Sequence, residues 1–305
     1  MSLLVVGSIA LDTVKTPVEE HSDLLGGSAS YAALGASFFT PVNLVGVVGD
    51  DFPQSEFEFW ESRKIDARGV QRVHGKTFRW SGEYSWDLNS RETRSVALNV
   101  FETFSPTLPS DYRKTPFILL ANIAPTLQSH VLDQTSRPRF VIADTMDLWI
   151  QTTRAALNAL LPRVDLLILN DSEARQMTNE TSLIRAGRKI RDFGPRYVAI
   201  KKGEHGALLF GKNEFFSCGA YPLEDIHDPT GAGDTFAGGL AGYLAANVKE
   251  TLNFELLRKA MIYGSVLASF CVEAFSLERL RKLKLNEISE RYEMFKVMSQ
   301  FEVLR

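Results

Sequence analysis

The chain has 305 residues, of which 45% are hydrophobic and 23% charged, and its formal net charge is −3. This composition predicts one large globular domain with a sizeable core, and its slightly acidic balance excludes a binder of the nucleic-acid backbone. The apolar opening run carries no basic leader and is broken by Gly7, Ser8 and Asp12 well short of a membrane span, so we expect no membrane partner.

Cysteine and histidine usage gives no sign of a metal site. Cys218 and Cys271 lie far apart without metal-ligand spacing, which is typical of reduced proteins and predicts a cytoplasmic location. The five histidines form no HxxxH or HExxH pairing, so a zinc site has little support.

Short apolar runs rich in β-branched residues alternate along the chain with longer segments of helical period. This order predicts an α/β fold with a doubly wound, mostly parallel sheet flanked by helices. The expected strands are residues 3–9, 43–49, 117–123, 139–144, 165–170 and 196–203. The expected helices are residues 28–39, 55–65, 153–164 and 182–194, followed by a helix-rich C-terminal third.

Residues 76–100 interrupt this alternation. Their period of two and their polar turns predict a β-hairpin, and an inserted hairpin often covers a binding site. Together with residues 12–20 they are expected to form a small β-hairpin lid on a single domain that spans residues 1–305.

Two glycine-containing segments do not match known nucleotide motifs. The triplet GKT at residues 75–77 has Val70 where a P-loop requires its first glycine. The segment GAGDTF has Phe236 where a dinucleotide fingerprint requires its third glycine. Both a P-loop enzyme and a nicotinamide enzyme are therefore disfavoured.

The segment HDPTGAGDTFAGGL, residues 227–240, carries the strongest chemical signal. Gly231 and Gly233 let backbone N–H groups turn toward one point, and a helix beginning near Asp234 adds its unpaired N–H groups and positive dipole end. A carboxylate beside such an anion hole is useful where it faces a substrate hydroxyl, as phosphoryl transfer to an alcohol requires. The alternative is a plain N-cap and a tight turn.

Three further glycines, Gly238, Gly239 and Gly242, follow inside the expected helix. Each costs on the order of 1 kcal/mol relative to alanine, which indicates that backbone or ligand approaches closely. Close packing between helices is the other explanation.

These residues resemble the C-terminal signature of the ribokinase-like, or PfkB, family of carbohydrate and nucleoside kinases. Other segments extend the resemblance: GSIALD with GGSASYAALGASFF resembles the N-terminal strand and double-glycine segment, NDSE the NxxE motif, and KKGEHGALLF the KxGxxG strand and turn. All occur in the family's order, so the resemblance spans nearly the whole chain.

The resemblance implies a role for each matched residue. Asp234 is the expected general base, and Gly231, Ala232 and Gly233 form the expected anion hole for the transferred phosphoryl. The other expected site residues are Asp12, Gly26 and Gly27 for the acceptor, Asn170 and Glu173 for Mg²⁺ through water, and Lys202, Gly203, Gly206 and Gly264 for the ATP nucleotide. Asp228 and Thr230 resemble positions near a monovalent-cation site in some members, which predicts activation by K⁺.

Some of these positions have plainer explanations when the residues are considered alone. Asp12, at the end of the first expected strand, suits a turn, and Asn170 and Glu173 suit a helix start. Lys202 suits a solvated side chain.

The chain also departs from the family pattern. Pro229 stands where many members have threonine, and Ser28 and Tyr31 replace the lysine and asparagine of ribokinases, which argues against strict ribokinase specificity. The aromatic side chains near the expected acceptor site favour a nucleoside if they stack on a base, and otherwise pack a hairpin or a dimer face; they are Tyr31, Phe78, Trp80, Tyr84 and Trp86.

The leading hypothesis is therefore a Mg²⁺-dependent enzyme that transfers the γ-phosphoryl of ATP to a primary hydroxyl of a sugar or nucleoside. The competing hypothesis is a catalytically silent sugar- or nucleoside-binding protein of the same fold, against which the intact GAGD and NxxE segments argue. A nucleotide-dependent enzyme of another fold is a third hypothesis. The resemblance also implies a homodimer through the lid, because exposed hairpin edges favour pairing.

Overall fold

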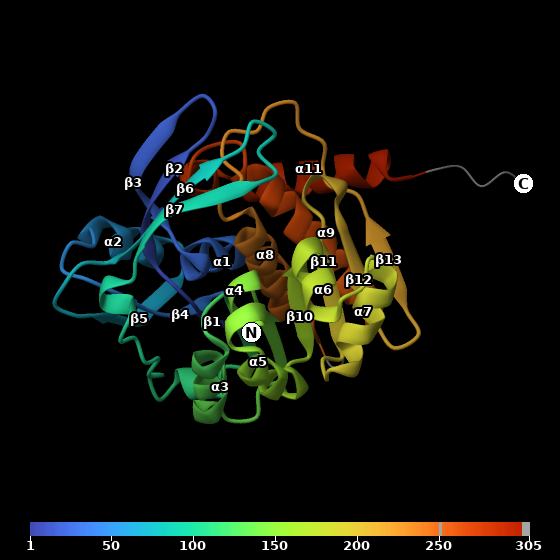
Figure 1. Ribbon diagram of the computed structural model, residues 1–305, viewed down its shortest axis with the longest axis horizontal. Coiled ribbons are helices and arrows are strands. Elements are labelled where there is room, and N and C mark those ends of the chain that lie inside the picture. The colour runs from blue at the N-terminus through green and yellow to red at the C-terminus, as the bar shows by residue number, and fades with distance from the viewer. Residues whose placement is uncertain (250–251, 301–305) are drawn as a thin grey trace, which may run out of the picture.

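The computed structural model describes residues 1–249 and 252–300, and its main element is a nine-stranded sheet with the order β13-β12-β11-β10-β9-β8-β1-β4-β5 (Figure 1). The strands are β1 (Leu3–Val6), β4 (Val42–Val48), β5 (Ile65–Arg72), β8 (Phe117–Leu120), β9 (Phe140–Asp144), β10 (Leu166–Asn170), β11 (Tyr197–Lys201), β12 (Ala207–Phe210) and β13 (Phe215–Cys218). Neighbours from β5 to β11 pair in parallel, whereas β12 and β13 are added antiparallel.

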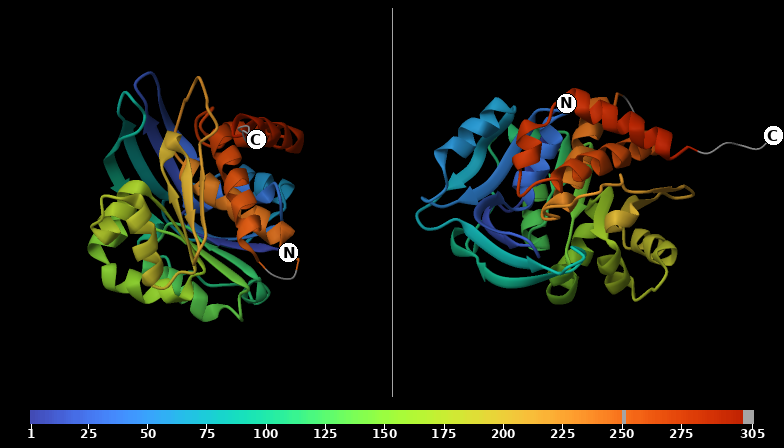
Figure 2. Two further views of the ribbon diagram at one scale, coloured as in Figure 1. Left: turned by 90° about the vertical axis from the view of Figure 1, so that its right-hand side faces the viewer. Right: turned by 90° about the horizontal axis from the view of Figure 1, so that it is seen from above.

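Helices cover both faces of this sheet, and the left view of Figure 2 shows the two helix layers on opposite sides. One layer holds α1 (Ser28–Ser37), α2 (Gln54–Ser62), α8 (Ala232–Asn247), α9 (Phe254–Cys271), α10 (Glu278–Lys282) and α11 (Leu285–Met298). The other layer holds α3 (Pro125–Gln134), α4 (Asp147–Thr152), α5 (Arg154–Leu160), α6 (Asp171–Thr178) and α7 (Leu183–Asp192). Short 3-10 turns occupy Asn99–Phe101, Tyr112–Lys114, Leu161–Arg163 and Gly203–His205.

The strand sequences explain the two layers. In β1, Leu3 and Val5 pack into one hydrophobic core while Leu4 and Val6 pack into the other. Successive side chains of a strand point to opposite faces, so a strand that is buried on both faces must be apolar throughout. The expected doubly wound α/β class is confirmed.

One expected helix boundary is wrong. The sequence predicted helix over residues 55–65, but α2 ends at Ser62 and Ile65 begins strand β5. Lys64 has a φ of 59°, a left-handed conformation that ends the helix. In β5 only Ile65 and Gly69 are fully buried, so this strand lacks the apolar run that identified the others.

A second, four-stranded sheet, hereafter the small sheet, has the order β3-β2-β6-β7 and lies at the top left of Figure 1. Its strands are β2 (Ala10–Lys15), β3 (Glu20–Gly26), β6 (Phe78–Tyr84) and β7 (Arg91–Ala97). Two antiparallel hairpins are joined by the parallel pair β2 and β6. Every residue of the edge strand β7 is exposed, and the homodimer expected through this sheet stays a prediction.

Helix α8 packs unusually close to its neighbours. A methyl group placed on Gly238 would overlap the carbonyl oxygen of Ala32 in α1, and one on Gly242 would lie 2.7 Å from the Cα of Ala36. On the α9 side, a methyl group on Gly239 would lie 2.7 Å from a Leu267 side-chain carbon. Backbone contact between helices therefore explains the glycines that the sequence left open.

This contact predicts that Gly238→Ala destabilises the protein. Alanine favours a helix by about 1 kcal/mol, but the overlap is with backbone that no rotamer change relieves. We expect a net loss of about 1–3 kcal/mol in the free energy of unfolding, measured by urea denaturation. Gly219→Ala is the control, because nothing lies within 4 Å of its added methyl group. Equal stability of Gly238→Ala and the unmodified protein would contradict the packing account.

Candidate active site

The DPTGAGD segment forms a left-handed turn into α8. Gly231 is the N-cap of α8 with a φ of 76°, and a methyl group on it would overlap the ring of Tyr31. Only glycine combines this φ with such a close contact. The Ala232 N–H donates to the Pro229 carbonyl at 3.3 Å. The first turn of a helix leaves its other backbone N–H groups without partners inside the helix, so Gly233 and Asp234 present donors at the positive end of the α8 dipole.

Asp234 lies in this first turn and is half-buried. Burial raises the pKa of Asp234 to about 6, and the charge of Asp144 adds to the rise, whereas Lys201 and Arg91 oppose it. A carboxylate with a pKa near 6 is ionised at neutral pH and is a stronger base than an ordinary aspartate, so it suits removal of a proton from a hydroxyl.

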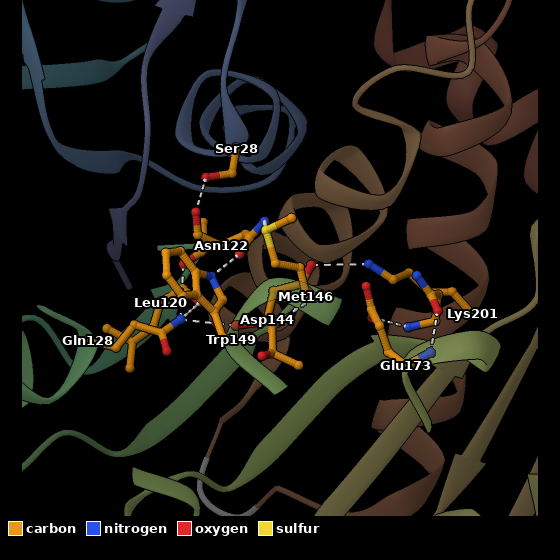
Figure 3. A network of polar contacts seen from close by, with 12 residues as sticks. Ser28, Leu120, Asn122, Gln128, Asp144, Met146, Trp149, Glu173 and Lys201 are labelled. Atoms are coloured by element: carbon orange, nitrogen blue, oxygen red, sulfur yellow. Dashed lines mark hydrogen bonds and ion pairs between the residues drawn. The ribbon is translucent and has the colours of Figure 1, made fainter. Parts of the chain in front are cut away.

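Three neighbouring strands end in polar residues beside this turn, namely Asp144 on β9, Asn170 on β10 and Lys201 on β11. The ammonium of Lys201 pairs with Asp144 Oδ2 at 3.1 Å, and both side chains are largely buried (Figure 3). A methyl group on Gly233 would lie only 3.0 Å from Lys201 Nζ. The strand ends and the start of α8 therefore meet at one place.

Asn170 and Glu173 form the reciprocal cap that starts α6. The Glu173 N–H donates to Asn170 Oδ1 at 2.8 Å, and the Asn170 N–H donates to Glu173 Oε2 at 2.7 Å. Burial raises the pKa of Glu173 to about 7, while the charge of Lys201 lowers it (Figure 3). Asn170 and Glu173 thus start helix α6, and Glu173 also lies within the charge of Lys201.

Asp12 does not end the first strand, as the sequence had suggested. It lies inside β2, paired with Leu24 and Trp80, because Gly7–Ile9 separate β2 from β1. The carboxylate is 5% exposed, and its Oδ1 has no hydrogen-bond partner within the described residues. A methyl group on Gly26 would overlap the Asp12 carboxylate.

The charge environment of Asp12 links it to the α8 turn. Burial raises the pKa of Asp12 to about 7, a hydrogen bond from the Gly27 backbone opposes the rise, and the charges of Asp228 and Asp234 add to it. Gly27 has a φ of 88° and caps α1. A buried carboxylate oxygen without a partner is energetically unfavourable, and such groups concentrate where a ligand hydroxyl binds.

Lys202, Gly203 and Gly206 form the turn between β11 and β12. The Lys202 N–H donates to the Gly206 carbonyl at 2.8 Å, and both glycines have positive φ, 55° at Gly203 and 87° at Gly206. Lys201 ends β11 and lies within the charges of Asp144, Glu173 and Asp234, so it is Lys201 that joins the acidic cluster. The nucleotide contact expected of Lys202 and these glycines stays a prediction.

Gly264 has a packing explanation. It lies in α9, where a methyl group would be 2.7 Å from the carbonyl oxygen of Phe236 in α8. Its lack of a side chain thus allows two helices to touch, and this contact accounts for the glycine without a nucleotide.

Asp228 and Thr230 connect the α8 turn to two other segments. Asp228 is fully buried and accepts from the Thr230 N–H at 2.8 Å and from the Ser276 N–H at 3.1 Å. The Thr230 hydroxyl donates to the Tyr84 hydroxyl of the small sheet at 3.1 Å. These contacts give both residues a role in fixing the turn, and activation by K⁺ stays a prediction.

The aromatic residues expected to stack on a base differ in environment. Tyr31 is only 2% exposed and packs against Gly231, which favours the packing alternative there. Phe78 stacks on Phe101 at 5.3 Å between ring centroids, and the Trp80 ring lies 5.3 Å from the Arg91 guanidinium. Trp86 is 89% exposed.

Sequence reasoning missed Asp144, Lys201 and Arg91. Asp144 ends an expected strand and Lys201 lies two residues before the end of another, and in open α/β sheets ligands bind at the carboxyl ends of parallel strands. That rule was sufficient to nominate both. Arg91, whose charge lowers the pKa of Asp12 and of Asp234, starts an exposed strand and carried no sequence signal.

Within residues 1–249 and 252–300, no cluster of three or more histidine, cysteine or acidic side chains is arranged to hold a metal ion. Among the same residues, no helix combines the length and apolar character needed to cross a membrane.

Comparison with known proteins identifies relatives of this chain. The chain is 30% identical over 251 residues to the cytidine kinase of Thermococcus kodakarensis, an alignment that covers 80% of this chain and 88% of that enzyme. The nucleoside kinase structure of Methanocaldococcus jannaschii superimposes with a TM-score of 0.76 at 18% identity, covering 96% and 98% of the two chains. The Salmonella enterica aminoimidazole riboside kinase, solved with aminoimidazole riboside and an ATP analogue, gives 0.75 at 18% identity, covering 96% and 100%.

The family model described as pfkB family carbohydrate kinase matches residues 132–280, a span that includes Asp144, Asn170, Lys201 and Asp234. The fold agrees with the ribokinase-like structures, and a relative at 30% identity is matched over most of its length. The chain therefore belongs to the pfkB family of carbohydrate kinases, and it is a phosphotransferase with an alcohol group as acceptor.

Proposed function

We propose that this protein is an ATP- and Mg²⁺-dependent kinase that phosphorylates a primary hydroxyl of a nucleoside or sugar. The cytidine kinase relative makes a pyrimidine nucleoside the first acceptor to test. One observation carries the proposal: two carboxylates have raised pKa values, the buried Asp12 and the half-buried Asp234, and the charge of Asp234 at the start of α8 adds to the rise at Asp12.

The two carboxylates suit different parts of an acceptor. Asp12 has an unpartnered buried oxygen, which can accept a hydrogen bond from a sugar hydroxyl. Asp234 lies in the first turn of α8, beside the N–H groups that would stabilise negative charge. An acceptor held by Asp12 would thus present another hydroxyl to Asp234.

The chemical step is a direct displacement. Asp234 takes the proton of the acceptor hydroxyl, the hydroxyl oxygen forms a bond to the γ-phosphorus, and the bond from that phosphorus to the bridging oxygen of ADP breaks. The Gly231, Ala232 and Gly233 turn donates N–H groups to the moving phosphoryl, in the manner of an oxyanion hole. No covalent intermediate with the protein is required.

The acidic residues beside Lys201 fit a Mg²⁺ that arrives with the nucleotide. Mg²⁺ usually keeps several waters and is bound through one or two carboxylates plus substrate phosphates, which agrees with the lack of a larger ligand cluster in the described residues. Glu173 and Asn170 would hold it through water, and the bound ion would neutralise phosphate charge.

The central test is release of ADP from ATP and Mg²⁺ in the presence of cytidine, uridine, adenosine, ribose or other single sugars. We expect turnover with at least one nucleoside. Turnover with free sugars alone would support the transfer chemistry and reject a nucleoside acceptor. Tight binding of an acceptor without ADP release by any of them would favour the silent binding protein.

Asp234→Asn should nearly abolish this turnover while ATP still binds. A positioned general base contributes about 10²–10⁴-fold, so we expect kcat to fall at least about 100-fold, with the Kd for ATP measured by calorimetry changed little. Asp225→Asn, at an exposed position before the turn, is the matched control. Near-normal kcat in Asp234→Asn would reject Asp234 as the base.

Asp12→Asn should weaken binding of the acceptor substrate and make the folded protein more stable. Loss of the acceptor contact is expected to raise the KM for the acceptor at least about 10-fold, with little change in the KM for ATP. The pKa of Asp12 rises from 3.8 to about 7 on folding, so the unmodified protein loses stability as pH rises through this interval.

Asparagine does not ionise, so Asp12→Asn does not lose stability in this way as pH rises. The difference in free energy of unfolding between the variant and the unmodified protein should therefore grow between pH 4 and pH 8. One pKa unit corresponds to about 1.4 kcal/mol, so the rise from 3.8 to about 7 corresponds to a gain of up to about 4 kcal/mol at pH 8. Urea denaturation at both pH values measures it. A variant less stable than the unmodified protein at pH 8 would contradict the unfavourable burial of this charge.

A further inference from the structure

The ammonium of Lys201 is buried but incompletely hydrogen-bonded. Its side chain is 19% exposed, and within residues 1–249 and 252–300 its one hydrogen-bond acceptor is Asp144 Oδ2, at 3.1 Å. An ammonium carries three N–H donors, so two remain for another partner. A buried cation with spare donors is unfavourable unless a ligand completes its hydrogen bonds.

The direction of the side chain points to the class of that ligand. Lys201 Nζ would lie 3.0 Å from a methyl group on Gly233, so the ammonium rests against the first turn of α8. The backbone N–H groups of that turn and the ammonium therefore face the same region. Donors and positive charge converging on one point favour a phosphate oxygen.

The charges around Lys201 distinguish it from an ordinary surface lysine. Asp144, Glu173 and Asp234 all act on Lys201 by their charges, and Figure 3 shows its side chain directed toward Asp144. One cation among three carboxylates offsets their repulsion before a nucleotide binds. It would also offset the repulsion between these carboxylates and an arriving phosphate.

Building on the proposed function, we propose that Lys201 is a catalytic residue that donates a hydrogen bond to an oxygen of the transferred phosphoryl, and that Asp144 positions it. Lys201 keeps its proton throughout the displacement. Its contribution is charge: it stabilises negative charge on the phosphoryl as the bond to ADP breaks. Asp144 acts only through Lys201, by fixing the direction of the ammonium.

Lys201→Met tests the proposal through turnover and binding together. Loss of one preorganised donor costs about 10²–10³-fold in kcat in comparable sites, and we expect a decrease of this size. By calorimetry, the variant should bind ATP at least about 10-fold more weakly than the unmodified protein but bind AMP, which lacks the β- and γ-phosphates, with unchanged affinity. Lys212→Met, at an exposed turn position, is the matched control.

A lysine that only balances the acidic cluster would give a different result. A folded Lys201→Met variant with kcat and ATP affinity within about threefold of the unmodified protein would overturn the proposal. If Lys201→Met does not fold, Lys201→Gln is the second variant: it removes the charge but keeps a polar side chain, and we expect kcat to fall at least about 10-fold; unchanged kcat would overturn the proposal.

The role of Asp144 is tested by non-additivity. Asp144→Asn should lower kcat about 10-fold, and adding it to Lys201→Met should lower kcat no further, because both changes remove the same interaction. Independent, multiplying effects would reject the positioning role. If the unmodified protein binds no ATP at all, the proposed function itself fails, which is distinguishable from failure of the Lys201 assignment alone.

Discussion

The close packing of α8 against α1 and α9 is the constraint on which the site depends. Gly238 and Gly242 bring the α8 backbone onto Ala32 and Ala36, and Gly239 admits Leu267 from α9. A helix held this closely has little freedom to slide or rotate. Its first turn, with the donors after Gly231 and the carboxylate of Asp234, is therefore fixed against the carboxyl ends of β9, β10 and β11.

The site combines this rigid frame with unfavourable electrostatics. Burial raises the pKa values of Asp12, Glu173 and Asp234 to about 7, 7 and 6, and the ammonium of Lys201 lies among the latter two and Asp144. Raised pKa values and unpartnered polar atoms reduce stability, and they cluster where a ligand completes the interactions. Function and stability therefore make opposite demands on Asp12.

Much of this arrangement was predictable from the sequence, because the strands that form the centre of the sheet are apolar on both faces and the glycine turn has a recognisable spacing. The edge strand β5 was missed because its exposed residues remove the apolar run. Lys201 was missed in favour of Lys202, although the KxGxxG spacing, with Gly203 and Gly206, places the motif lysine at Lys201. The long-range contacts of Tyr31 and Gly264, with Gly231 and Phe236, are set by packing that spacing does not reveal, and the nucleotide contact expected of Gly264 stays a prediction.

The most direct measurement of the central claim is the pH dependence of kcat from pH 4.5 to 9 at saturating ATP, Mg²⁺ and acceptor, with far-UV circular dichroism to verify folding. If Asp234 removes the hydroxyl proton and burial raises its pKa to about 6, kcat should be constant above about pH 7 and fall tenfold per unit below about pH 6. A kcat that stays constant from pH 7 down to pH 5 in the folded enzyme would contradict a catalytic base with this environment.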